Sequence, residues 1–180
     1  TPPSRGPAFG RPLTSNVSRQ MRRLLVLMAL VAASLSATAA EIVEWATAIS
    51  KKPGTDRSIV YRYAKEFRQG FDRSRFPDRV IIVWKYESES GMPAQPERES
   101  MDRMEDLLAP LIEKSGKSVL ALVSTGEGWR EWIFYARSEE EFFASLNGLL
   151  AKEPRFPIEI HASKDPAWST YERFHGEVRE

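Results

Sequence analysis

Residues 80–163 alternate short strand-like runs with two helical stripes, and this order constrains the fold more than any other feature of the chain. The run over 80–87 (VIIVWKYE) is almost continuously β-branched or aromatic, which is typical of a central, buried strand. A helix is predicted over 96–115, where the apolar residues recur at helical spacing: Met101, Met104, Leu108 and Leu111. Pro110 is expected to kink this helix or to end its regular part.

The second half of this region predicts a hairpin, a helix and a last strand. Residues 118–124 and 129–137 read as two strands around a glycine-containing turn. Ser138 and Glu141 form a capping box, which predicts that a helix starts there and runs to residue 150. Residues 158–163 predict the final strand, and the chain after Asp165 is expected to form a short terminal turn.

An amino-terminal hairpin precedes these elements. Residues 42–50 and 57–66 both alternate apolar and polar side chains, and a turn rich in Lys, Pro and Gly separates them. The fold class is therefore α+β. We expect a ferredoxin-like two-layer sandwich, built on a split βαβ unit whose antiparallel sheet carries two helices on one face. The hairpin is expected to extend this sheet or to cover part of its open face.

The first 39 residues contain five Arg and no acidic residue. From Met21, two Arg, an apolar run and the small residues before Ala40 follow in the order of a secretory signal peptide. The apolar run is shorter than the roughly 20 residues that a spanning helix needs. We therefore expect an upstream, disordered extension over 1–20, a signal peptide over 21–39 and a single domain over 40–180. The protein is then exported, periplasmic or secreted, with no stable membrane span after cleavage; a retained anchor is the alternative.

Composition excludes several classes of function. The chain has no Cys and only two His, so it can form no disulfide, zinc-thiolate site or Cys nucleophile, and it has too few ligands for a multi-histidine metal site. Residues 40–180 carry 21 basic and 25 acidic side chains, a formal charge of −4. Proteins that bind nucleic acid are normally basic on the binding face. We expect no nucleic-acid partner, no bound metal and no cofactor.

The candidate site lies on the face of the sheet opposite the two predicted helices. If Trp132 and Phe134 pack against those helices, alternation directs their strand neighbours to the opposite face. Adjacent strands then bring together a group of polar residues: Lys85, Glu131, Tyr135, Glu159 and His161. A His beside a carboxylate can serve as an acid or base, because negative charge raises its pKa. Cross-strand ion pairs on a solvated face are the alternative interpretation.

No catalytic motif occurs in the sequence: GxSxG, the Walker loop and HExxH are all absent. A non-catalytic binding or interaction module, with an unknown protein or small-molecule partner, is therefore the leading hypothesis, and an enzyme is the less favoured one. The binding candidates are Lys85, Tyr135, Trp132 and Trp168. The alternative is a small hydrolase-like enzyme that uses His161 with Glu131 or Glu159.

Residues 118–168 resemble a bacterial family known as domain of unknown function 695. The features that carry the resemblance are the strand WREWIFYAR over 129–137, the helix start at Ser138, and the segment from Ile158 to Trp168. The match over 45–84 is looser but in the same order. The resemblance implies an α+β sandwich, sometimes adjoining a ferredoxin-like domain similar to the regulator of ribonuclease E activity. It implies no catalytic residues, and the expected signal peptide argues against a role in RNA degradation.

Overall fold

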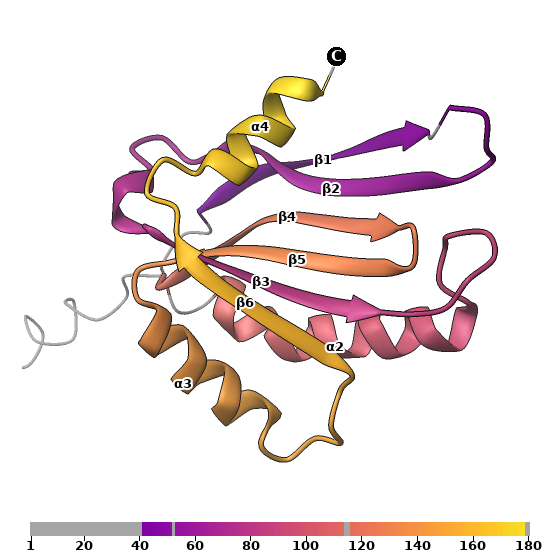
Figure 1. Cartoon of the computed structure of the whole chain (residues 1–180). Helices are drawn as coiled ribbons and strands as arrows, with labels where there is room; N and C mark the ends of the chain where they lie inside the picture. The colour runs from indigo at the N-terminus through magenta and orange to yellow at the C-terminus, as the bar shows by residue number, and fades with distance from the viewer. Residues whose placement is uncertain (1–40, 52, 114–115, 179–180) are drawn as a thin grey trace, which may run out of the picture. The chain divides into compact units, whose positions relative to one another are not determined.

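The computed structural model describes residues 41–178 except 52 and 114–115 (Figure 1). The expected extension over 1–20 and the expected signal peptide over 21–39 lie outside the described residues. The elements are β1 (Ile42–Lys51), β2 (Ser58–Phe67), the short 3-10 helix η1 (Arg73–Arg75), β3 (Asp78–Lys85), α2 (Gln95–Glu113), β4 (Ser118–Gly126), β5 (Trp129–Ala136), α3 (Glu139–Leu150), β6 (Ile158–Lys164) and α4 (Ser169–Glu177).

The six strands form one antiparallel sheet in the order β1-β2-β4-β5-β3-β6. The predicted α+β class is confirmed, and the predicted hairpin of β1 and β2 extends the sheet beyond β4. With six strands, the order of the whole sheet does not reduce simply to the four-stranded ferredoxin-like arrangement that we expected. β1 and β6 are the two edge strands, and β4 is buried along its whole length.

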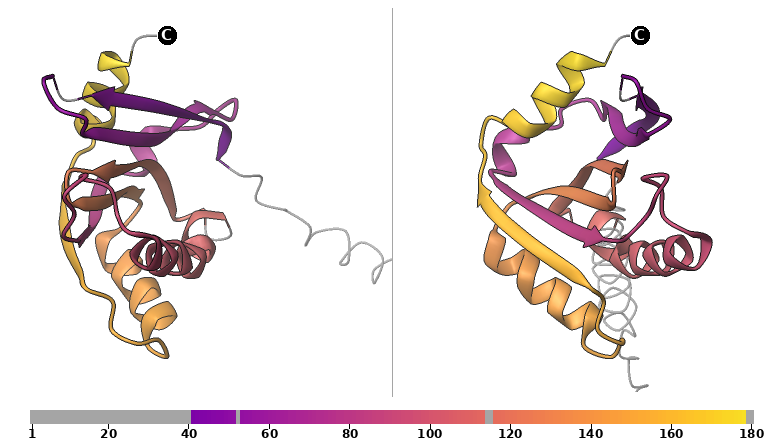
Figure 2. Two further views of the ribbon diagram at one scale, coloured as in Figure 1. Left: turned by 90° about the vertical axis from the view of Figure 1, so that its right-hand side faces the viewer. Right: turned by 45° about the vertical axis from the view of Figure 1, so that its right-hand side comes forward.

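Helices α2 and α3 cover one face of the sheet (Figures 1 and 2). Apolar side chains of β3, β4 and β5 meet the helical stripes in one core, in which Met101, Met104 and Leu108 of α2 are completely buried. The predicted cap of α3 is confirmed, because the Ser138 hydroxyl accepts a hydrogen bond from the backbone N–H of Glu141 at 3.3 Å. Pro110 lies inside α2, near its carboxyl end.

The opposite face of the sheet is partly covered by α4, where we expected only a terminal turn (Figure 2). Trp168, Tyr171 and Phe174 recur every three residues, so they lie on one side of the helix and pack on this face. There they join Tyr63 and Tyr135 in a second core cluster. The turn prediction was wrong because the Asp165 carboxylate, three residues before the N-cap residue Trp168, accepts hydrogen bonds from the backbone N–H groups of Ser169 and Thr170 at 2.8 and 3.1 Å and so satisfies the first turn of a helix.

Candidate functional site

Three of the predicted polar residues lie side by side at the β6 edge of the sheet. Lys85 on β3 donates hydrogen bonds to both carboxylate oxygens of Glu159 on β6, at 2.8 and 3.0 Å. The Nε2 atom of His161 is 3.8 Å from the Oε2 atom of the same carboxylate. The hydrogen bond and the positive charge of Lys85 lower the pKa of Glu159 below its ordinary value. All three side chains are mostly exposed, as expected for cross-strand partners on a solvated surface.

Glu131 is on the same face but on the other side of β3. The backbone of Val83 pairs with Glu131 on β5 and with Glu159 on β6, so one strand separates the two carboxylates. Glu131 accepts a hydrogen bond from the Ser124 hydroxyl at 3.2 Å. The predicted row of polar residues therefore divides into a group of three at β6 and a separate carboxylate at β5.

The three aromatic candidates, Trp132, Tyr135 and Trp168, are completely buried. Trp132 faces α2, where its indole N–H donates to Glu105 at 2.8 Å. Tyr135 points to the opposite face, as alternation predicted, but Trp168 covers it. These residues hold helices against the sheet, and their side chains do not reach the surface.

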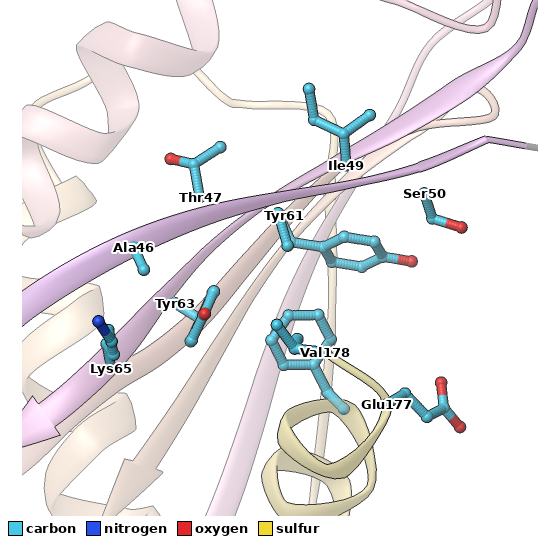
Figure 3. A pocket seen from close by; sticks show the side chains of 11 residues that line it. Ala46, Thr47, Ile49, Ser50, Tyr61, Tyr63, Lys65, Glu177 and Val178 are labelled. Atoms are coloured by element: carbon cyan, nitrogen blue, oxygen red, sulfur yellow. The ribbon is translucent and has the colours of Figure 1, made fainter. Parts of the chain in front are cut away.

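A groove of about 640 Å³ lies between the β1–β2 hairpin and the end of α4 (Figure 3). Its floor is formed by small side chains of β1 and by two aromatic rings of β2: Ala46, Ala48, Ser50, Tyr61 and Tyr63. Phe174, Glu177 and Val178 form the wall on the α4 side. Alternation along β1 explains the space, because Thr47 and Ile49 point away from α4 while the small side chains of Ala46 and Ser50 point to its side of the strand (Figure 3).

The groove combines three aromatic rings with polar and charged side chains. The Phe174 ring packs on Tyr61 and Tyr63, with ring centroids 4.8 and 5.2 Å apart respectively. Lys65 lies at one end, and its Nζ atom is 3.2 Å from the Glu44 carboxylate. Burial raises the pKa of Tyr61, and the negative charges of Glu177 and Glu131 raise it further. The Tyr61 hydroxyl therefore stays protonated at neutral pH and can donate a hydrogen bond to a ligand.

Buried hydrogen bonds fix α4, and therefore the wall of the groove, against the sheet. The Tyr135 hydroxyl donates to the Asp165 carboxylate at 2.9 Å and accepts from the backbone N–H of Tyr171 at 3.3 Å. The Tyr171 hydroxyl in turn donates to the backbone carbonyl of Ala64 on β2. Burial raises the pKa of Tyr171 to about 12, so this hydroxyl remains a donor across the physiological range.

A second, smaller groove of about 350 Å³ lies on the α2 side of β2 and β4. Ion pairs cross it from the sheet to the helix: Arg62 with Glu105, and Arg130 with Asp102 at 2.7 Å. Because these partners already neutralise each other, this groove offers a ligand less unsatisfied charge than its composition indicates. In the parts of the chain that the structure describes, no group of three or more His, Asp or Glu side chains is arranged to hold a metal ion.

Sequence reasoning missed the groove at β1 and α4. The available signal was the run Ala46, Ala48 and Ser50, which places small residues on one face of a strand whose other face carries Trp45 and Ile49. The wall formed by the end of α4 could not be expected, because the chain after Asp165 was interpreted as a turn.

Comparison of the chain with known protein families gives a family match. The family of unknown function DUF695 matches residues 44–175, which include every helix and strand from β1 to α4 apart from the first residues of β1 and the last residues of α4. The chain belongs to this family. No curated protein matches the chain. Within the described residues of this DUF695 protein, no helix is long and apolar enough to cross a membrane.

Proposed function

We propose that this DUF695 protein is a non-catalytic binding module, and that the groove between the β1–β2 hairpin and α4 is its ligand site. The observation that carries the proposal is the groove itself: about 640 Å³ of space in which three aromatic rings lie beside polar and charged groups. Small-molecule sites in proteins have this size, and they too combine aromatic side chains with polar groups that orient the ligand. The expected ligand is a small molecule with an aromatic or apolar part and with polar groups that can reach Lys65 and Glu177.

An aromatic sulfonate dye, anilinonaphthalene sulfonate, tests this proposal. Its rings match the aromatic floor, and its sulfonate can approach the Lys65 amine. We expect one dye to bind per folded chain with increased fluorescence. Ala48→Phe fills the groove from β1 and should weaken binding at least about tenfold, the loss that 1.4 kcal/mol produces. Ala144→Phe, on the exposed side of α3, is the matched control and should leave binding unchanged. Dye binding that is absent, or that Ala48→Phe does not weaken, would contradict the proposal.

The hydrolase-like alternative has one observation in its favour, the approach of His161 to Glu159 at 3.8 Å. Neither of the two grooves described above includes His161, and both side chains are more than half exposed. Acid–base catalysis depends on groups that converge in a concave site where water can be excluded. Hydrolysis of p-nitrophenyl acetate by the wild type but not by His161→Ala would favour the enzyme.

We further propose that the protein is exported, with the leader over 21–39 removed to leave residues 40–180 as a single domain. The order of charged, apolar and small residues in that leader supports export. β1 begins at Ile42, directly after the expected cleavage sites at Ala39 and Ala40. Mass spectrometry of the protein from fractionated cells should find an amino terminus at residue 40 or 41, and an intact leader in the membrane fraction would contradict export.

We also propose that the part of the sheet formed by β3 to β6, with α2 and α3, is a ferredoxin-like unit to which the β1–β2 hairpin was added. The neighbour order β4-β5-β3-β6 and the antiparallel pairing of these strands support this interpretation. The groove then lies where the added hairpin and the added helix α4 meet, outside the ferredoxin-like unit.

A further inference from the structure

The two edges of the sheet differ in how they are protected. On the face opposite α2 and α3, the edge strand β6 presents polar and charged groups, among them Glu159 and His161. β1, at the other edge, is a ten-residue strand with exposed apolar side chains: Val43 is 63% exposed, Ile49 62% and Trp45 37%. Long edge strands with exposed apolar residues pair readily with another strand, and charges on an edge prevent such pairing.

Most of β1 is regular enough to accept a new neighbour. Its pairing with β2 is irregular only between Ile42 and Trp45, and from Trp45 to Lys51 the register runs without interruption. In the described part of the chain, β1 has a strand neighbour on one side only. Seven of its ten residues are exposed. Thr47 and Ile49 point away from α4 (Figure 3), and on the other face the Phe174 ring of α4 packs on Tyr61 and Tyr63 of β2.

We propose that β1 pairs with β1 of a second copy of this chain, antiparallel and centred on Thr47, to join the two sheets into one. A two-fold axis perpendicular to the sheet at Thr47 keeps each face continuous across the junction. In this register Trp45 lies opposite Ile49 of the second copy, and the same pair recurs on the other side of the axis. Aromatic and β-branched residues are favourable partners across antiparallel strands.

Charge complementarity favours a second copy over an unrelated strand. The amino-terminal end of β1 carries Glu41 and Glu44, which also pair with Arg68 and Lys65 of the same chain, and its carboxyl-terminal end is basic, with Lys51 followed by Lys52. Antiparallel self-pairing places the acidic end of each strand beside the basic end of the other, at both ends of the junction. In the regular part of β1, from Trp45 to Lys51, no two like charges then lie directly opposite each other.

The junction also brings the two ligand grooves together. Ala46 and Ala48 face α4. In this register Ala46 of each copy lies opposite Ala48 of the other copy. The small-residue floors of both grooves therefore adjoin on one face of the joined sheet. The pairing itself depends only on β1 and does not rest on the proposed ligand.

Sedimentation velocity of the purified chain over a concentration series tests the pairing. The wild type should reach twice the mass of one chain. Thr47→Lys places two like charges at the axis and should weaken the dimer about tenfold or more. Ala144→Lys adds the same charge on α3 and should leave the dimer unchanged. A wild type that stays monomeric at the highest concentration would overturn the proposal, as would a dimer that Thr47→Lys does not weaken.

A charge exchange between two variants tests the register. Glu44→Lys makes both ends of β1 basic and Lys51→Glu makes both ends acidic, so each variant alone should dimerise more weakly than the wild type. A mixture of the two should form a heterodimer close to wild-type affinity, because every end again meets the opposite charge. A mixture that dimerises no better than either variant alone would overturn the proposed register. Far-UV circular dichroism of each variant confirms that it is folded.

Discussion

The indole ring of Trp168 stacks on the phenol ring of Tyr135, with their centroids 3.9 Å apart and their planes 6° from parallel. Trp168 immediately precedes α4 and Tyr135 is near the end of β5, so this contact joins the last helix to the middle of the sheet. Trp168 has a φ of 55°, a left-handed conformation that is unfavourable for a large side chain. Its stacking, and the hydrogen bond from its indole N–H to the Phe76 carbonyl at 3.0 Å, compensate for that conformation.

Trp168→Ala should lower the free energy of unfolding by about 3–5 kcal/mol, because it removes a large, completely buried side chain and leaves a cavity. Trp129→Ala is the matched control: Trp129 is 41% exposed at the β4–β5 turn, so its loss should cost far less. Urea denaturation followed by circular dichroism measures both. Equal losses for the two variants would contradict the role assigned to Trp168.

Asp165 couples the docking of α4 to pH. Burial raises the pKa of this carboxyl, but hydrogen bonds from the backbone of Ser169 and Thr170 and from the Tyr135 hydroxyl outweigh burial, so its pKa lies below the ordinary value. A pKa that is lower in the folded than in the unfolded chain means that the ionised carboxylate stabilises the fold. This stability is fully present above the unfolded pKa of about 4 and is lost as the pH falls through the folded pKa.

Asp165→Asn should therefore lower the free energy of unfolding at pH 7 by about 1–3 kcal/mol, the cost of weakening a buried hydrogen-bonded group. The difference from the wild type should shrink as the pH falls below about 4, where the wild type loses the same charge. Asp56→Asn, in the exposed β1–β2 turn, should behave like the wild type at every pH. Urea titrations from neutral to acidic pH measure the difference, and a gap that stays constant into acid would contradict this account.

The strands and the first two helices were predictable from local patterns, and α4 and the groove were not. The Ser138 cap and the helical spacing of Met101, Met104 and Leu108 each specify one element without help from the rest of the chain. Alternation also placed Lys85 beside Glu159, because it fixes which side chains share a face. The groove depends on where α4 packs, and Pro166 gave that segment the pattern of a turn.

Gly126 and Gly148 provide a paired test of backbone geometry. Gly126 has a φ of 153°, and a Cβ atom there would lie 2.4 Å from the backbone oxygen of Ser58 and 2.8 Å from the Cα atom of Ile59. Gly126→Ala should lower the free energy of unfolding by about 1–3 kcal/mol, because β2 and β4 must separate. At Gly148, in α3, a Cβ atom meets nothing within 4 Å. Gly148→Ala should therefore raise the free energy of unfolding by about 0.5–1 kcal/mol. Thermal unfolding of both variants measures the opposite signs.

Lys85 sets the protonation of Glu159 at the β6 edge. The hydrogen bond and the charge of Lys85 lower the pKa of Glu159, and the charge of His161 contributes less. In Lys85→Ala the pKa of Glu159 should therefore rise towards the ordinary value for Glu, about 4.3. Carbon-detected NMR of the side-chain carboxylates during an acid titration measures this shift directly.

Lys117→Ala is the matched control for this titration. Lys117 pairs with Glu141 at 3.0 Å, so its removal takes away a Lys–Glu pair of similar exposure and should leave the Glu159 titration unchanged. The midpoint of urea unfolding should not change measurably in Lys85→Ala, since exposed ion pairs contribute little to stability. If the pKa of Glu159 stayed the same without Lys85, or if the unfolding midpoint fell markedly, the interpretation of Lys85 and Glu159 as a solvated cross-strand pair would be wrong.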